Sequence, residues 1–297
     1  VIDQLDGRAQ HVEDARATDV YLLAPATYST INKFALGLAD NAVTTTLATA
    51  LGRFEAGLCH IQVVPTMHGM MVNPVLRESL ARLTDLGVEV VPPRPGAGKA
   101  NLPQVDALVA QEVRGLALRC GKAALAGRKV LVTGGPTPVP IDAVRVLSNR
   151  YSGATAIGIA EAFYTAGAEV ELLLSGTHIT APEWIPTRRV ETFDDYQEAC
   201  LATAADIGIF SAAVADYRPE KTHSAKLASG APELNIGLVP TAKVVTAWRN
   251  AFPQAKLISF KLEAGLDDEA LLAVARARVG AHSDLVVANH AQGGDVF

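Results

Sequence analysis

Short apolar runs alternate with longer stretches of helical periodicity along the chain. This order predicts parallel α/β units. In the first part of the chain, the predicted strands are 20–24, 60–64 and 88–91, and the predicted helices are 30–38, 73–86 and 105–116. Within the second helix, Leu76, Leu80 and Leu83 fall at i, i+4 and i+7, and Gly87 stands where a helix commonly ends.

The alternation is interrupted at 92–103, a segment rich in proline and glycine, and a second loose stretch covers 121–128. The first of these is the best linker candidate, and the boundary is placed near residue 120, giving domains 1–120 and 121–297. In the second domain the predicted strands are 129–133, 170–174, 207–213, 256–260 and 285–288, with a β segment at 233–238, and the predicted helices are 152–166, 194–204, 241–251 and 267–279. The expected fold class is therefore α/β, with a Rossmann-like open sheet in the second domain.

Charge and hydropathy exclude two classes of partner. The formal net charge is −5, and Lys and Arg are scattered along the chain, so neither nucleic acid nor an anionic membrane surface is an expected partner. No apolar run approaches the roughly 18 residues that span a bilayer. Because the chain begins at Val1 without an initiator Met and ends at Phe297 after a Gly-rich turn, we expect a fragment.

Cysteine and histidine spacing gives no sign of a disulfide framework or a zinc site. The three cysteines are far apart, which favours buried thiols and a cytoplasmic location; they are Cys59, Cys120 and Cys200. Four histidines also lack metal-ligand spacing and are expected at the surface or as caps; they are His60, His178, His282 and His290.

Ligands of open α/β sheets bind beyond the carboxyl ends of the strands. The strand at 129–133 is followed by Gly134-Gly135 and then by three prolines within six residues. A dinucleotide fingerprint runs directly into a helix, which these prolines prevent, so the phosphate loop is expected to be long and split. Lys99 also lacks the glycine spacing of a P-loop. A plain turn at Gly134-Gly135 is the alternative.

A polar cluster, Ser148 to Gly153, opens the alanine-rich helix at 152–166. Backbone amides at a helix start and the helix dipole favour an anion, so this cluster is a candidate phosphate nest. Asn149 supplies an amide and Arg150 a fixed charge. The alternative is that Ser152 only caps the helix and Asn149 only fills a turn.

A third polar segment follows the strand at 207–213 and runs through Asp216-Tyr217-Arg218 into a loop that ends at Gly230. This loop is expected to form an active-site flap. Asp216 is a candidate ligand for Mg²⁺ or for a sugar hydroxyl, and Lys226 is a candidate for neutralising phosphate charge.

The three segments resemble, in order over residues 129–289, the ligase half of the bifunctional phosphopantothenoylcysteine decarboxylase/phosphopantothenate–cysteine ligase family. The matching stretches are VTGGPTPVPIDAVRVLSNRYSGATAIGIAEA, SAAVADYRP, AKLASG, ELNIGLVPT, ISFKLE and LVVAN. The resemblance implies a coenzyme A biosynthesis ligase in which the carboxylate of 4′-phosphopantothenate attacks a nucleoside triphosphate with Mg²⁺. Cysteine then attacks the acyl-nucleotidylate and forms an amide.

The resemblance also implies roles for individual residues. Asn149 corresponds to a residue that serves formation of the acyl-nucleotidylate. Lys226 corresponds to the first lysine of a loop needed for the cysteine step, and the later lysines of that loop are absent here. The full expected set is nucleotide-binding Gly134, Gly135, Ser152, Gly153, Ala213, Asp216, Lys261 and Asn289, substrate-binding Asp142, Arg145 and Arg150, and the metal ligand Asp216. Many bacterial and archaeal members use CTP and the animal enzyme ATP. The ISFKLE stretch is somewhat like the animal form, so the base stays open.

The first half resembles the FMN-dependent decarboxylase partner over about residues 8–120. Segments 23–30 and 65–71 stand where that family has Ala-Pro-Ala-Thr-Ala-Asn-Thr and Pro-x-Met-Asn-x-x-Met. The corresponding residues are Pro25, Ala26, Thr27, Ser29, Thr30, Met67 and His68. Ser29 and His68 replace the two asparagines. The flavin phosphate loop and catalytic histidine would precede Val1, so decarboxylation is expected of the full-length protein and not of this chain.

Three other functions stay open at this point. They are a Rossmann-type oxidoreductase, a flavin-binding or regulatory subunit without ligase activity, and a non-enzymatic assembly module. Because decarboxylase relatives form trimers and ligase relatives dimers, a homo-oligomer is expected.

Overall fold

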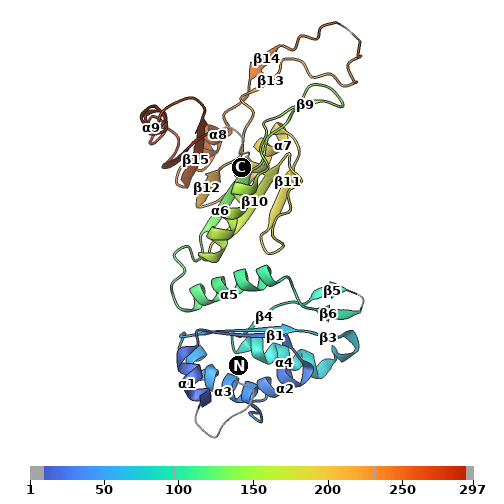
Figure 1. Cartoon of the computed structure of the whole chain (residues 1–297), viewed down its shortest axis with the longest axis vertical. Coiled ribbons are helices and arrows are strands. Elements are labelled where there is room, and N and C mark those ends of the chain that lie inside the picture. Colours follow the sequence, from blue (N-terminus) through green and yellow to red (C-terminus); the bar gives the residue numbers. More distant parts are fainter. Residues whose placement is uncertain (1–9, 97, 231, 292–297) are drawn as a thin grey trace. The chain divides into compact units, whose positions relative to one another are not determined.

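The computed structural model describes residues 10–96, 98–230 and 232–291. They fall into two compact units that divide between Ala124 and Leu125, except that Thr165–Gly167 group with the first unit (Figure 1). Each unit has its own parallel sheet and its own buried core.

The first unit is built around a three-stranded parallel sheet of order β1-β2-β4. The strands are β1 (Val20–Ala26), β2 (His60–Pro65) and β4 (Glu89–Val90). The helices are α1 (Gln10–Ala17), α2 (Tyr28–Ala35), α3 (Ala42–Glu55), α4 (Pro74–Asp85) and α5 (Val105–Arg119), with the 3₁₀ turn η1 (Gly69–Met71). A small antiparallel sheet pairs β3 (Met67–His68), β6 (Lys99–Asn101) and β5 (Arg94–Gly96).

The central strand of this unit, β2, is buried along its whole length. Ile61 and Val63 belong to the core that α2, α3 and α4 complete, whereas Val64 packs with Leu108 of α5. Helices thus cover both faces of the sheet, as the apolar run in β2 predicts. The helix predicted at 73–86 is confirmed as α4, with Asn73 as its N-cap.

Two expectations for the first unit are wrong. Segment 92–103 is not a linker: it forms the β5–β6 hairpin, which pairs with β3 inside the unit. Pairing with Met67 and His68 outweighs the local preference of proline and glycine for turns. The first strand also continues through Pro25 to Ala26, because its register on β2 shifts between Leu23 and Ala26. A proline is tolerated at such an irregularity.

The second unit contains a six-stranded parallel sheet of order β11-β10-β7-β12-β15-β16. The strands are β7 (Lys129–Gly134), β10 (Glu169–Ser175), β11 (Thr187–Val190), β12 (Ile207–Phe210), β15 (Lys256–Glu263) and β16 (Leu285–His290). The helices are α6 (Ala154–Thr165), α7 (Phe193–Ala202), α8 (Val244–Ala251) and α9 (Asp268–Arg276). Two antiparallel pairs complete it: β8 (Val139–Pro140) with β9 (Val146–Leu147), and β13 (Tyr217–Pro219) with β14 (Leu238–Pro240).

Side chains alternate between the two faces of this sheet. Leu131 packs with Tyr196 of α7 and Trp248 of α8, whereas Val132 packs with Ala156 of α6 on the other face. Figure 1 shows α6 lying along the sheet, and β13 and β14 forming an arm that extends away from it. The predicted Rossmann-like sheet is therefore confirmed, with a sixth strand, β11, that the sequence did not indicate.

Two of the three thiols behave as expected for small buried hydrophobes, whereas Cys120 is only half-buried. Cys59, Cys120 and Cys200 are free, and Cys59 and Cys200 are buried. Burial raises the pKa of Cys200 to about 12, so this thiol is unreactive at neutral pH. Within the described residues, no helix is both long and apolar enough to cross a bilayer.

Candidate active site

The carboxyl end of β7 carries two glycines that close packing requires. A Cβ on Gly134 would lie 2.2 Å from Cβ of Ala156 in α6, and one on Gly135 would lie 2.2 Å from the carbonyl oxygen of Ser175. Gly135 also has φ +82°, in the left-handed region that favours glycine. These positions bring the strand end directly against the start of α6.

The residue before α6, Gly153, packs against the glycine turn at Gly135. Gly153 has φ +86°, and a Cβ there would lie 3.1 Å from the backbone nitrogen of Gly135. Ser152 accepts the amide of Ala154 through Oγ at 3.3 Å, so it does cap the helix. Its carbonyl also accepts the hydroxyl of Thr177 at 2.7 Å. The first turn of α6 therefore faces a compact backbone turn, the arrangement that suits phosphate.

Asn149 connects this loop to the segment after β12. Its Nδ2 donates to the carbonyl oxygen of Ala213 at 3.0 Å and to that of Val214 at 3.3 Å. The amide of Ala213 in turn donates to Gly135 at 3.0 Å. The structure thus brings together the predicted catalytic residue Asn149 and two predicted nucleotide-binding positions, Gly135 and Ala213.

Asp142 is buried, and both oxygens of its carboxylate accept hydrogen bonds from other groups of the protein. Oδ1 accepts the amides of Val144 and Arg145, each at 2.8 Å. Oδ2 accepts Nη1 of Arg145 and the amide of Leu227, each at 3.0 Å. Hydrogen bonds from the amide of Val144, and then from those of Leu227 and Arg145, hold the pKa of Asp142 below its usual value. Arg150, the third predicted substrate-binding residue, is exposed.

The predicted catalytic lysine lies in the loop that follows β13. Lys226 is exposed, and its neighbour Leu227 is fixed to Asp142. Asp216 is also exposed and forms an ion pair with Lys243 at 2.6 Å. Among the described residues, no group of three His, Cys, Asp or Glu side chains is placed to hold a metal ion. A divalent ion at Asp216 would therefore depend on the substrate for its other ligands.

Two further predicted residues lie at the carboxyl ends of β15 and β16. Lys261 forms an ion pair with Glu263 at 2.5 Å, and Asn289 is exposed and stands opposite Leu262 in the neighbouring strand. Because all six strands are parallel, their carboxyl ends lie on the same side of the sheet. Lys261 and Asn289 therefore lie on the side that also carries Gly134 and Ala213.

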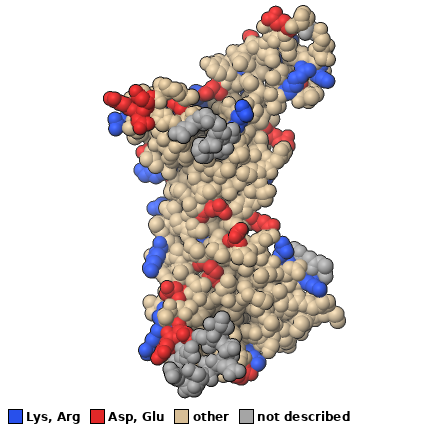
Figure 2. Space-filling view, in the orientation of Figure 1, with Lys and Arg blue, Asp and Glu red and all other residues tan. Residues whose placement is uncertain are grey.

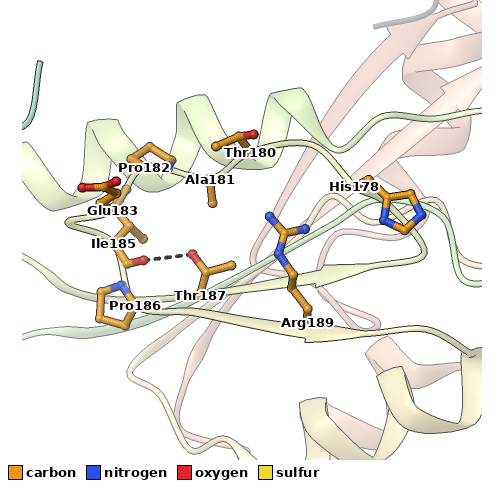
Figure 3. Close-up of a pocket in the computed structure, with 9 residues that line it drawn as sticks. All are labelled: His178, Thr180, Ala181, Pro182, Glu183, Ile185, Pro186, Thr187 and Arg189. Atoms are coloured by element: carbon orange, nitrogen blue, oxygen red, sulfur yellow. Dashed lines mark hydrogen bonds between the residues drawn. The ribbon is translucent and has the colours of Figure 1, made fainter. Parts of the chain in front are cut away.

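A surface pocket is formed by the loop that connects β10 to β11 and by the first residues of β11 (Figure 3). Arg189 points toward the connecting loop and donates to the carbonyl oxygens of Thr177 at 3.1 Å and Ile179 at 2.5 Å. The pocket is lined by His178, Thr180, Ala181, Pro182, Glu183, Ile185, Pro186, Thr187 and Arg189. None of the predicted site residues is among them.

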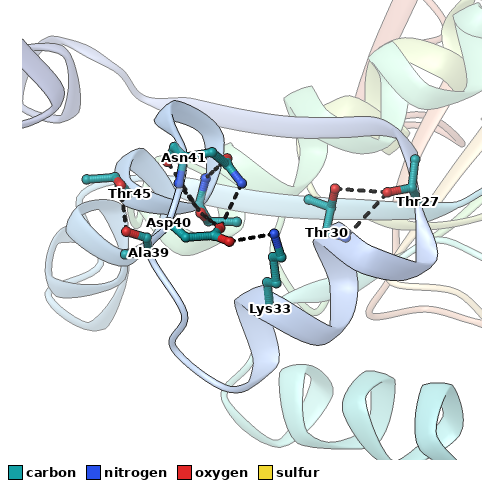
Figure 4. A network of polar contacts seen from close by, with 8 residues as sticks. Thr27, Thr30, Lys33, Ala39, Asp40, Asn41 and Thr45 are labelled. Carbon is teal, nitrogen blue, oxygen red and sulfur yellow. Dashed lines mark hydrogen bonds and ion pairs between the residues drawn. The ribbon is translucent and has the colours of Figure 1, made fainter. Parts of the chain in front are cut away.

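In the first unit, the predicted flavin-site residues occupy the carboxyl ends of β1 and β2. Thr27 caps α2 by accepting the amide of Thr30 at 3.3 Å, and Figure 4 shows the two hydroxyls facing each other. Ser29 is exposed beside Pro25 and the buried Ala26. Hydroxyl groups here suit the polar edge of a flavin or its substrate. The described ends of β1 and β2 carry Thr27 and Thr66 instead of a glycine turn that would fit a phosphate.

The second part of this predicted site is the segment after β2. Met67 is half-buried and packs against the core of the unit. His68 is exposed, and its Nδ1 accepts the amide of Met70 at 3.2 Å, so it caps η1.

A buried polar cluster at the opposite end of the first sheet was missed from the sequence. His60, expected at the surface, is buried, and its Nε2 lies 2.9 Å from Glu89 and 3.7 Å from Glu112 of α5. Burial raises the pKa of Glu112 to about 7. Gln62 is also fully buried in the same strand. The available signal was the polar residues at alternate positions of β2, which place both side chains on one face.

The fold defines an α/β protein of two units, one with a flavoprotein-like sheet and one with a Rossmann-like open sheet whose first strand ends in a tightly packed glycine turn. Family models agree. Residues 1–116 match the flavoprotein family, and residues 125–297 match the DNA/pantothenate metabolism flavoprotein C-terminal domain. The chain belongs to the family of bifunctional coenzyme A biosynthesis proteins, enzymes that combine a flavoprotein-type decarboxylase with a ligase.

Individual relatives support this assignment. The coenzyme A biosynthesis bifunctional protein CoaBC of Thermococcus kodakarensis is 35% identical over 97% of this chain and 72% of its own length. A cysteine/cysteine sulfinic acid decarboxylase from an unidentified prokaryote is 32% identical over 90% of this chain and 76% of its own length. The crystal structure of the DNA/pantothenate metabolism flavoprotein from Streptococcus pneumoniae matches with a TM-score of 0.52 and 26% identity, over 57% of this chain and 86% of that one.

Proposed function

We propose that the second unit joins 4′-phosphopantothenate to cysteine through an acyl-nucleotidylate, with CTP or ATP as the activating nucleotide. The observation that carries the proposal is the contact of Asn149 with Ala213. It joins the segment that precedes α6 to the segment after β12, and the amide of Ala213 in turn donates to the carbonyl oxygen of Gly135. Open α/β sheets bind their ligands at the carboxyl ends of the strands, where these segments lie.

In the first step, the substrate carboxylate attacks the α-phosphate and pyrophosphate leaves. The backbone amides near Gly135 and Gly153 and the amino end of α6 stabilise the charge of the phosphates. Asn149 fixes the segment that precedes α6 relative to Ala213. Positioning and charge neutralisation supply most of the acceleration, because the attack requires no proton transfer by the protein.

In the second step, the amine of cysteine attacks the activated carbonyl and the nucleotide leaves. Lys226 supplies a positive charge from an exposed loop. An ammonium group there stabilises the departing phosphate. Lys261 and Asn289 contribute to the nucleotide pocket from the ends of β15 and β16.

Mg²⁺ is proposed as the accompanying ion. Asp216 is the protein ligand that we assign, with the triphosphate supplying further oxygens, as is usual for Mg²⁺. The ion would compete with Lys243, which pairs with Asp216 at 2.6 Å.

Small-molecule substrates, a homo-oligomer and a cytoplasmic location complete the proposal. The surface is consistent with it: on the face drawn in Figure 2, the basic and acidic groups of the described residues are scattered and form no broad basic area. Apolar side chains are exposed on the arm and beside it, including Tyr217, Leu238 and Val146, and a second copy of the chain could cover them.

The test is pyrophosphate release, measured with CTP and with ATP, each with and without 4′-phosphopantothenate and before cysteine is added. The proposal predicts release that requires 4′-phosphopantothenate and Mg²⁺. No release with either nucleotide would contradict it. Hydride transfer to or from a nicotinamide cofactor would instead support the oxidoreductase alternative.

A further inference from the structure

The loop that carries Lys226 is fixed to the β8–β9 hairpin at three positions, Thr222, His223 and Leu227. The hydroxyl of Thr222 donates to the carbonyl oxygen of Pro140 at 3.2 Å, and the amide of His223 donates to that of Ile141 at 3.0 Å. The third position is Leu227, which Asp142 holds. Figure 1 shows the segment that contains β9 running beside the base of the arm.

Two side chains hydrogen-bond to the backbone of Leu227, one to its N–H group and one to its carbonyl oxygen. Asp142 Oδ2 accepts the Leu227 amide at 3.0 Å, while Arg145 Nη2 donates to the Leu227 carbonyl oxygen at 3.3 Å. Arg145 Nη1 also donates to Asp142 Oδ2 at 3.0 Å. This ion pair keeps both side chains in the orientation in which they bind the Leu227 backbone. A charge-assisted pair of this kind is stronger and more directional than a neutral hydrogen bond.

We infer that Asp142 and Arg145 are positioning residues that clamp the backbone of Leu227 and thereby hold Lys226 for the cysteine step. The inference rests on the proposed function for the role of Lys226. It revises the expectation that both residues bind substrate: the Asp142 side chain is fully buried, and each of its oxygens already accepts two hydrogen bonds.

The clamp also connects the two half-sites. Asp142 and Arg145 lie a few residues before Asn149 in the sequence, and Asn149 is bonded to Ala213. The segment 142–149 therefore has two roles. It contains Asn149, which we assign to activation, and it fixes the loop of Lys226, which we assign to amide formation. Loss of the clamp frees the lysine loop but leaves the Asn149 contact intact, so the two half-reactions respond differently.

The test compares Asp142→Asn and Arg145→Lys with the wild type in two measurements. The first is hydrogen exchange of backbone amides in segment 222–230. The second is the rate of each half-reaction, pyrophosphate release and amide formation from cysteine. Asp206→Asn is the matched control, because Asp206 also accepts a backbone amide, that of Lys129 at 2.8 Å, but at the amino end of the sheet.

The clamp predicts faster exchange in segment 222–230 for both variants and unchanged exchange in α6 and β7. Amide formation should fall about 100-fold, as small misplacements of a reacting group can cause, while pyrophosphate release changes little and acyl-nucleotidylate accumulates. Unchanged exchange at Leu227 would overturn the clamp. An equal fall in both half-reactions would overturn the positioning role and indicate a general structural one.

The exchange measurement also separates this inference from the proposed function. If the wild type releases no pyrophosphate with either nucleotide, the proposed function fails and the catalytic part of the inference fails with it. Exchange in segment 222–230 then still decides whether Asp142 and Arg145 hold the loop.

Discussion

Asn149 donates its side-chain amide to the carbonyl oxygen of Ala213 across 3.0 Å, although 64 residues separate the two in sequence. In Asn149→Asp, a carboxylate would face this oxygen and that of Val214, and their repulsion would displace the segment that leads into α6. We expect pyrophosphate release to fall about 100-fold. Asn250→Asp, at an exposed site in α8, is the control and should keep the wild-type rate. Wild-type release by Asn149→Asp would contradict the role of Asn149.

The glycine turn is predicted to tolerate no side chain. Gly135→Ala combines an unfavourable φ with a Cβ 2.2 Å from a carbonyl oxygen, and should lower the free energy of unfolding by about 3 kcal/mol. Gly158→Ala is the matched control within α6, where a Cβ would meet nothing within 4 Å, and should raise it by about 0.5–1 kcal/mol. Urea unfolding followed by tryptophan fluorescence reports on this unit, because Trp184 and Trp248 both lie in it. Equal stability of the two variants would contradict this.

The buried carboxyl of Glu112 predicts a pH dependence of the first unit. Burial raises its pKa from 4.5 to about 7, with His60 opposing and Glu89 reinforcing the shift. The folded state therefore binds more protons than the unfolded state between these values. The free energy of unfolding should fall as pH rises through this range, by about 3 kcal/mol in all.

Glu112→Gln should remove this slope and make the first unit more stable than the wild type at pH 8. The measurement is urea unfolding followed by far-UV circular dichroism, because both tryptophans report on the other unit. Glu78→Gln, an exposed change in α4, is the control and should keep the slope. An identical pH dependence in Glu112→Gln would contradict the assignment.

The long helices and buried strands could be predicted from the sequence because their apolar periodicity is local. β11 (Thr187–Val190) could not, since its two arginines and its edge position leave it without an apolar pattern. The β5–β6 hairpin could not be predicted from the sequence either, because its stability depends on pairing with β3, which is distant in the chain.

The candidate site shows the same division. The glycine turn, the helix start and the lysine loop could each be found from local composition. The bonds that join them, Asn149 to Ala213 and Asp142 to Leu227, cross 64 and 85 residues and depend on the folded backbone. His60 was misplaced for a related reason: its partners Glu89 and Glu112 come from other elements, and without them a buried histidine is unfavourable.

The roles proposed for Asn149 and Lys226 both depend on one reaction, the formation of an amide between 4′-phosphopantothenate and cysteine. Mass spectrometry of a single-turnover reaction with CTP or ATP, Mg²⁺ and isotopically labelled cysteine tests it most directly, with Lys226→Gln beside the wild type. The wild type should yield labelled phosphopantothenoylcysteine with one pyrophosphate per product, and Lys226→Gln should accumulate the acyl-nucleotidylate. Absence of labelled product from the wild type with both nucleotides would contradict the account.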